Sequence, residues 1–174
     1  RTFAKKKPDA VVIECMAVNP QYQWIAEHKM IQSTISVITN VRPDHIDQMG
    51  FTLKDNARCL SNTIPFNGNM VTVSGDMNLD GQINSVDQDI NDIFHKITNE
   101  RKTKLHQASL EEVPDGCIDR FDYIEHMDNV ALALKVCELS GVDKEIAIDG
   151  MVKTQPDPGA TIIWQLNFLD VKNH

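Results

Sequence analysis

The sequence lacks any apolar run long enough to cross a membrane. A spanning helix needs about 18 or more consecutive apolar residues, and none of the 174 residues belongs to such a run. The first residues also lack the apolar core of a signal peptide. These absences predict a soluble, cytoplasmic protein, and the length of 174 residues with 41% hydrophobic content predicts a single main core.

Basic residues are too few for a nucleic-acid-binding surface. The chain has 17 Lys and Arg against 25 Asp and Glu, a formal net charge of -8. Binding to a phosphate backbone depends on clustered Lys and Arg. We therefore expect no nucleic-acid partner.

Cysteine pairs and phosphate-binding loops are absent as well. The four cysteines are widely spaced, with no CxxC pair and no adjacent histidine cluster, which predicts reduced thiols. No glycine-rich loop with a following Lys and Ser or Thr occurs. The chain opens on RTFAKKKPDA without an initiator methionine, and we expect it to be an internal piece of a larger protein.

Strand and helix patterns alternate along the chain. β-branched apolar runs predict strands at 11–15, 34–39, 70–73 and 104–108, and a further strand at 161–166. Helical spacing predicts helices at 21–32, 52–63, 86–98, 128–139 and 143–152. The pattern predicts an α/β fold, a mostly parallel sheet with flanking helices. We expect one partial domain over 1–155, then a linker and the start of a second domain at 156–174.

Metal-type side chains follow the first two predicted strands. Glu14 lies at the end of the first strand, and Asp44, His45 and Asp47 follow the second. Ligand sites of parallel sheets lie beyond the carboxyl ends of the strands, and Mg²⁺ is held by one or two protein groups with waters and phosphate oxygens. Two ordinary alternatives stay open, namely a satisfied core carboxylate at Glu14 and solvated turn residues at Asp44 and His45.

Five segments in fixed order carry a family resemblance. They are VVIECMAVNPQYQ, VITNVRPDHIDQMG, TIPFNGNMVTV, MDNVALALKV and QPDPGA, within residues 8–166. In this order they resemble the poly-γ-glutamate synthetases of bacterial capsules, the CapB or PgsB family of the Mur ligase superfamily. ECMAVNP and the DHxD segment are the most specific of them.

The resemblance implies an ATP-dependent amide ligase that joins glutamate through its γ-carboxyl group by way of an acyl phosphate. It implies that Glu14 and His45 bind Mg²⁺ and that Asn129 contacts the adenine of ATP, with a helix-start cap as the alternative role for Asn129. The implied partners are glutamate, the poly-γ-glutamate chain and membrane-embedded capsule-synthesis subunits. A homo-oligomer and a position at the inner face of the bacterial membrane also fit this family.

Two departures from the family pattern limit these expectations. The family's phosphate loop is absent, and the position of its carbamylated metal-binding lysine falls near Ser61, with no lysine adjacent. We therefore expect this chain alone to be inactive, and the sequence assigns no catalytic residue.

A calcium-loop pattern lies at residues 76–87. Oxygen ligands occur at positions 1, 3, 5, 9 and 12, with a backbone carbonyl at position 7 and Gly81 at the sharp turn. The residue pattern resembles one calcium-binding repeat of a dockerin domain, although a dockerin has two such repeats. The predicted Ca²⁺ ligands are Asp76, Asn78, Asp80, Gln82, Asn84 and Asp87. The alternatives are an Asp/Asn-rich turn before the next helix or, for the whole chain, a calcium-binding structural or interaction module.

Overall fold

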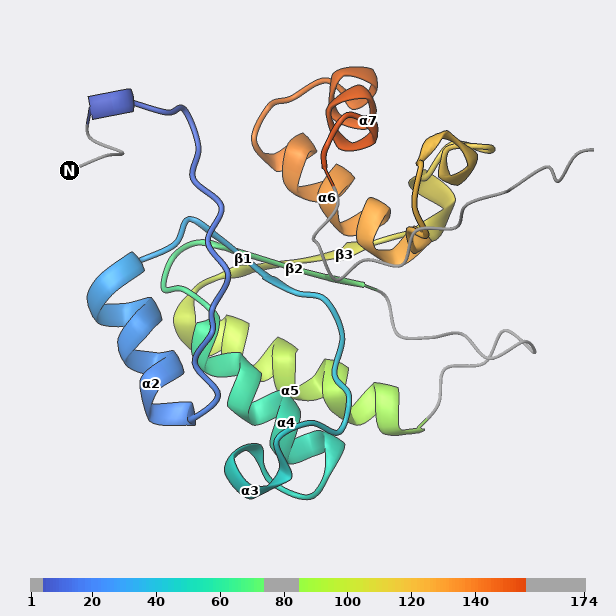
Figure 1. Cartoon of the computed structure of the whole chain (residues 1–174). Coiled ribbons are helices and arrows are strands. Elements are labelled where there is room, and N and C mark those ends of the chain that lie inside the picture. Colours follow the sequence, from blue (N-terminus) through green and yellow to red (C-terminus); the bar gives the residue numbers. More distant parts are fainter. Residues whose placement is uncertain (1–4, 74–84, 156–174) are drawn as a thin grey trace, which may run out of the picture. The chain divides into compact units, whose positions relative to one another are not determined.

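Three strands form a parallel sheet in the computed structural model, which describes residues 5–73 and 85–155. The strands are β1 (Ile35–Ile38), β2 (Asn69–Val73) and β3 (Lys104–Ala108), paired in the order β1-β2-β3 (Figure 1). The helices α3 (Ile46–Met49) and α4 (Leu53–Leu60) connect β1 to β2, and α5 (Ser85–Arg101) connects β2 to β3. The predicted α/β fold is confirmed.

The middle strand has the burial expected of a parallel sheet. Met70 and Val71 are fully buried and Thr72 is nearly so. Consecutive burial means that both faces of β2 are covered, as is usual in parallel sheets.

The contacts divide the described residues into two compact units. Of the described residues, the first unit contains 5–36, 41–70 and 85–104, and the second contains 37–40, 71–73 and 105–155. In the first unit α4 packs against α5, and α2 (Pro20–Ile25) packs against α4. In the second unit α6 (Met127–Leu139) packs against α7 (Lys144–Val152) and the short helix η3 (Leu110–Glu112).

Helix boundaries follow local signals in the sequence. The Thr52 hydroxyl accepts a hydrogen bond from the Asp55 backbone N–H, and the Asp55 carboxylate accepts one from the Thr52 backbone N–H, which together form a capping box at the start of α4. The Asp143 carboxylate caps α7 by accepting from the backbone N–H groups of Glu145 and Ile146. Gly141, in a left-handed conformation with φ 75°, follows the end of α6.

The predicted first strand is wrong. Residues 11–15 lie in the described part of the chain but form no strand and make no backbone hydrogen bond to another described residue. Val12 is 95% exposed, and Glu14 is exposed as well. The apolar run has strand propensity, but no neighbouring strand is paired with it here, and propensity alone does not create a strand.

The predicted helix at 21–32 is present, but the side chains it buries are polar and two of the apolar ones are exposed. It consists of α2 followed by a π-helical stretch, η1 (Ala26–Ile31). Tyr22 and Met30 are exposed, whereas Gln23 and Glu27 are buried. The Gln23 amide donates to the Ala17 carbonyl, and Glu27 accepts from the Ser33 N–H and hydroxyl. These bonds satisfy the buried polar groups, as burial requires.

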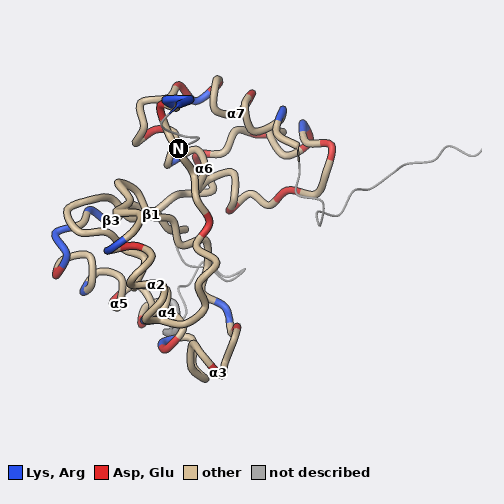
Figure 2. The backbone as a smooth tube through the Cα atoms, turned by 60° about the vertical axis from the view of Figure 1, so that its left-hand side comes forward, with Lys and Arg blue, Asp and Glu red and all other residues tan. Residues whose placement is uncertain are grey.

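Charges of both signs are spread along the chain. Figure 2 shows Lys and Arg scattered among Asp and Glu rather than gathered on one element. Among the described helices, none is long and apolar enough to cross a membrane.

The predicted linker and strand beyond residue 155 lie outside the described residues.

Candidate nucleotide pocket and metal loop

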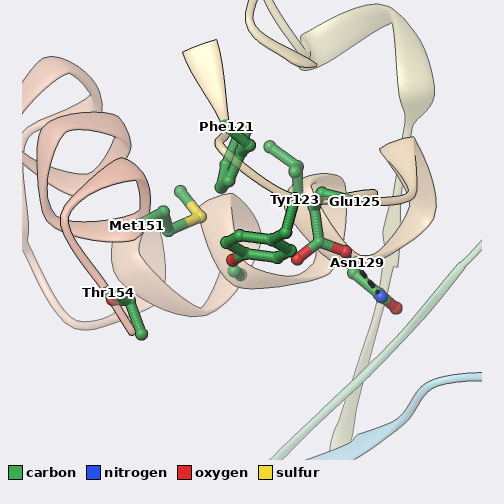
Figure 3. Close-up of a pocket in the computed structure, with 8 residues that line it drawn as sticks. Phe121, Tyr123, Glu125, Asn129, Met151 and Thr154 are labelled. Atoms are coloured by element: carbon green, nitrogen blue, oxygen red, sulfur yellow. Dashed lines mark hydrogen bonds between the residues drawn. The ribbon is translucent and has the colours of Figure 1, made fainter. Parts of the chain in front are cut away.

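A cavity of about 260 Å³ lies in the second unit beside the start of α6. Figure 3 shows the side chains around it, which come from the segment before α6, from α6 itself, from α7 and from the turn after α7. The lining residues are Phe121, Tyr123, Glu125, Asn129, Val130, Ala133, Met151 and Thr154. The volume is slightly below that of sites for drug-sized ligands, about 300–1,000 Å³, and suits part of a ligand, such as one planar base.

Two aromatic rings supply the apolar wall. The rings of Phe121 and Tyr123 meet edge to face, with their centroids 5.6 Å apart. Burial raises the pKa of the Tyr123 phenol, and the neighbouring Glu125 carboxylate raises that pKa further. The phenol therefore stays protonated at neutral pH. Ligand pockets are lined mainly by hydrophobic and aromatic side chains with a few polar groups, and this cavity has that kind of lining.

Asn129 lies at one end of this wall. Its side-chain amide donates to Glu125 Oε1 at 2.9 Å, the bond drawn in Figure 3. The alternative role, a helix cap, does not fit the geometry. The cap position of α6 is His126, which makes no side-chain capping bond, and Asn129 lies within the first turn.

The other lining residues were not predicted from the sequence. A signal was present, because Phe121, Tyr123 and Glu125 alternate along an irregular segment. In an extended chain successive side chains point to opposite sides, and the two residues between them, Asp122 and Ile124, are exposed. Met151 and Thr154 have no such signal, since their place in the lining depends on how α7 packs on α6.

A second group of polar side chains surrounds the loop that carries His45, in the first unit. Asn56, fully buried on α4, accepts from the Asp44 backbone N–H at 3.3 Å and donates to the carbonyls of Gly50 and Thr52 at 3.1 and 2.9 Å. These three bonds tie both ends of the loop to one helix. Asn56 is therefore the residue that positions this loop, and nothing in the sequence pattern marked it.

The loop holds His45 in an unusual conformation. Its backbone is left-handed, with φ 42° and ψ 51°, a region that few residues other than glycine adopt. The Asp44 carboxylate accepts from the His45 backbone N–H at 2.8 Å and lies 3.6 Å from His45 Nε2. Both side chains are more than half exposed, so this pair is open to a ligand from solvent.

A hydrogen bond connects the loop to the segment that carries Glu14. Asn19, five residues after Glu14, donates from its side chain to Gln48 Oε1 at 3.2 Å, three residues after His45. Two further side chains bond to this segment. The Gln23 amide donates to the Ala17 carbonyl, and the Cys59 thiol donates to the Val18 carbonyl and to the Gln23 side-chain oxygen. Glu14 itself is exposed and makes no described bond.

The donor types suit a Mg²⁺ ion that is held mainly by water and phosphate. Glu14 and Asp44 offer carboxylate oxygens, and His45 offers an imidazole nitrogen. Among the described residues, no group of three or more His, Cys, Asp and Glu side chains is arranged to hold a metal. One or two protein ligands are the usual number for Mg²⁺ at a phosphate site, and Mg²⁺ binding by Glu14 and His45 stays a prediction.

Ser61, near which the family's lysine position is expected to fall, lies in the interior. The Ser61 hydroxyl is buried and donates to the Ala57 carbonyl at 2.6 Å. Its backbone carbonyl accepts from the Arg101 guanidinium at 2.8 Å. This part of the chain is a packed interior.

The predicted calcium loop lies almost wholly outside the described residues. Residues 76–84 lie outside the described residues, and Asp87 falls in α5, where only the backbone is described. Calcium binding stays a prediction.

The four cysteines, Cys15, Cys59, Cys117 and Cys137, are free thiols. Burial raises the pKa of Cys59 and of Cys137, so neither is activated as a nucleophile.

Comparison with known proteins gives the same family as the motifs. No protein-family profile and no solved structure matches the chain. The Capsule biosynthesis protein CapB of Bacillus anthracis is 40% identical over 157 residues, which are 90% of this chain and 31% of that protein. The PGA synthase CapB of Bacillus subtilis (strain 168) is 37% identical over 166 residues, which are 95% of this chain and 39% of that protein. The chain thus spans less than half the length of these curated relatives, and over nearly all of its own length it is a homologue of CapB proteins.

Proposed function

We propose that this chain is part of an ATP-dependent amide ligase of the Mur type that builds poly-γ-glutamate for a bacterial capsule. The observation that carries the proposal is the 37–40% identity to two CapB proteins over 90% or more of the chain, one of them named a PGA synthase. The matched region includes most of the chain and therefore both the pocket beside α6 and the His45 loop. The activity is assigned to the full-length enzyme.

The proposed reaction has two steps. A γ-carboxylate oxygen of glutamate attacks the γ-phosphorus of ATP, which forms an acyl phosphate and releases ADP. The amino group of another glutamate then attacks the acyl carbon, an amide bond forms, and inorganic phosphate leaves with the oxygen that came from the carboxylate. A proton leaves the attacking amine in this second step.

Within this scheme the pocket beside α6 would hold the adenine. The Phe121 and Tyr123 rings offer apolar surface to the base and exclude water from it. The side-chain oxygen of Asn129 offers one hydrogen-bond acceptor at the edge. Correct placement of the base fixes where the triphosphate lies, and such positioning is a large part of catalysis in phosphoryl transfer.

Glu14 and His45 would hold Mg²⁺, and Asp44 lies beside His45. When bound, the ion would neutralise charge on the phosphate oxygens of ATP. The buried Asn56 would keep the His45 loop in place while the ligands come and go. This assignment rests on the residue matches to the family and on the bonds that tie the loop to α4 and to Asn19.

The remaining parts of the proposal concern the setting of the enzyme. We propose glutamate and the growing polymer as substrates, and capsule-synthesis membrane subunits as partners at the inner face of the membrane. A homo-oligomeric assembly belongs to the same proposal.

The proposal is tested by ADP release from ATP with and without glutamate, using the full-length protein. Wild type should release ADP only when glutamate is present. Asn129→Leu should raise the KM for ATP by roughly tenfold, the value of one lost hydrogen bond of about 1.4 kcal/mol, with a smaller effect on kcat. Asn99→Leu is the matched control, because Asn99 is exposed on α5 in the other unit, and it should leave both constants unchanged. Absence of glutamate-dependent ADP release from folded full-length protein would overturn the proposal.

A further inference from the structure

The Glu125 carboxylate, in the pocket beside α6, makes two hydrogen bonds with other residues at the start of α6. Oε1 of Glu125 accepts two hydrogen bonds, from the His126 backbone N–H at 2.8 Å and from the Asn129 side-chain amide at 2.9 Å. A single oxygen therefore links the start of α6 to the residue that would contact the base. Figure 3 shows Glu125 between Tyr123 and Asn129.

The chemistry of these two groups fixes the orientation of the Asn129 amide. An ionised carboxylate is only an acceptor, whereas an asparagine side chain has one donor end and one acceptor end. The end that lies 2.9 Å from Glu125 must therefore be the NH₂ group. The oxygen, Oδ1, is the end left for a ligand, and it bonds to none of the described residues.

We propose that Glu125 is a specificity-determining positioning residue, which makes the pocket select a purine with an amino group at position 6. The 6-amino group of adenine donates a hydrogen bond to Asn129 Oδ1. Hypoxanthine and guanine carry a carbonyl oxygen at that position, so two acceptors would face each other. A site whose polar groups are left unpaired rejects such an analogue more strongly than one that merely lacks a contact.

This inference rests on the proposed function, since it assumes that the pocket binds the base of ATP. It adds Glu125, a residue to which the family resemblance assigns no role. Glu125 acts through Asn129 and through the helix start, and it does not touch the phosphates that react.

The experiment compares ATP with ITP, which differs in having a carbonyl in place of the 6-amino group. Dissociation constants of both are measured by calorimetry on the full-length protein. Wild type should bind ATP at least roughly tenfold more tightly than ITP, the value of one hydrogen bond of about 1.4 kcal/mol. Glu125→Leu removes the acceptor, frees the amide to turn, and should bring the two affinities within about threefold of each other.

Three variants separate positioning from general damage. Glu125→Gln keeps an acceptor oxygen for both bonds, so it should retain most of the selectivity and remains informative if the Leu variant does not fold. Glu111→Leu, an exposed glutamate in the same unit, should leave the ATP-to-ITP ratio unchanged. In an Asn129→Leu background, Glu125→Leu should have no further effect on that ratio, because the pair acts as one unit.

The possible results lead to distinct conclusions. If wild-type protein binds neither nucleotide, the proposed function fails. Four other results would refute the role of Glu125 while ATP binding stands. Two of them are equal binding of ATP and ITP by wild type, and a wild-type ATP-to-ITP ratio in Glu125→Leu. The other two are loss of the selectivity in Glu125→Gln, and a change of the ratio by Glu125→Leu in the Asn129→Leu background that is as large as in wild type.

Discussion

At the scale of single residues, Asn56 is the buried side chain on which the His45 loop depends. Its replacement by Ala would leave the Asp44 N–H and the Gly50 carbonyl without their Asn56 side-chain partner, and the Thr52 carbonyl would keep only its bond from the backbone N–H of residue 56. An unpaired buried polar group costs about 1–3 kcal/mol, and we expect Asn56→Ala to lower the free energy of unfolding by about 3 kcal/mol. Urea denaturation measures this.

The control is Asn99→Ala, an exposed asparagine on α5, which should change the free energy of unfolding by less than about 0.5 kcal/mol. Equal effects of the two substitutions would show that Asn56 does not hold the loop.

The same loop also requires glycine at position 50. Its φ of 98° is unfavourable for other residues, and an added Cβ would lie 2.5 Å from Asp55 Cβ. The loop can therefore end beside the capping box of α4 only with glycine at this position.

His45 provides the residue-scale test of the metal site. We expect His45→Ala in the full-length protein to reduce glutamate-dependent ATP turnover by more than about tenfold, because loss of a metal ligand removes charge stabilisation from the transition state. The side chain is exposed, so the melting temperature should stay near that of wild type. His95→Ala, an exposed histidine on α5 in the same unit, is the control. Unchanged turnover of His45→Ala at saturating Mg²⁺ would refute the assigned role.

At the scale of elements, regular patterns predicted most of the fold. The strands at β1, β2 and β3 and the helices α4 to α7 were predicted to within a few residues, because apolar spacing, Thr52 and Asp143 at helix starts, and Gly141 at a helix end act locally. The strand at 11–15 was not, since strand formation needs a paired neighbour. Its side chains are exposed here despite an apolar sequence.

The candidate site was predicted less completely than the fold. Asn129, Glu14 and His45 came from motif matches, and the structure places Asn129 in a cavity and His45 in a held loop. Glu125 and Asn56 were missed, because a glutamate before a helix and an asparagine within one have many ordinary roles. Only the partners of their side chains show what they do, and those partners depend on tertiary packing.

The loop at 76–87 provides the element-scale prediction, and it rests on ligand spacing alone. Three Asp side chains in one short loop repel each other without a cation, so binding of Ca²⁺ to the native state should raise stability by mass action. We expect millimolar Ca²⁺ to raise the melting temperature more than equal Mg²⁺, which prefers a tighter octahedron. The effect should vanish in Asp80→Ala.

Calorimetry on the purified chain decides between a calcium loop and an acidic turn. Binding tighter than about 1 mM, the weak end of natural calcium loops, supports the loop. Weaker or undetectable binding would identify the segment as an ordinary turn before α5.

At the scale of the whole molecule, the chain corresponds to 31–39% of the CapB proteins it resembles. The described residues supply a base-sized pocket in one unit and a held His45 loop in the other. Neither feature alone transfers a phosphoryl group. The proposed activity therefore belongs to the full-length enzyme, where positioning of ATP and of the carboxylate must act together.

The central claim is that ATP activates a glutamate carboxylate as an acyl phosphate, and isotope transfer tests it most directly. Full-length protein is incubated with ATP, Mg²⁺ and glutamate whose γ-carboxylate carries ¹⁸O, and the released phosphate is analysed by mass spectrometry. The account predicts one ¹⁸O atom in each phosphate released together with a γ-amide bond. Phosphate without ¹⁸O, or phosphate release that does not depend on glutamate, would contradict it.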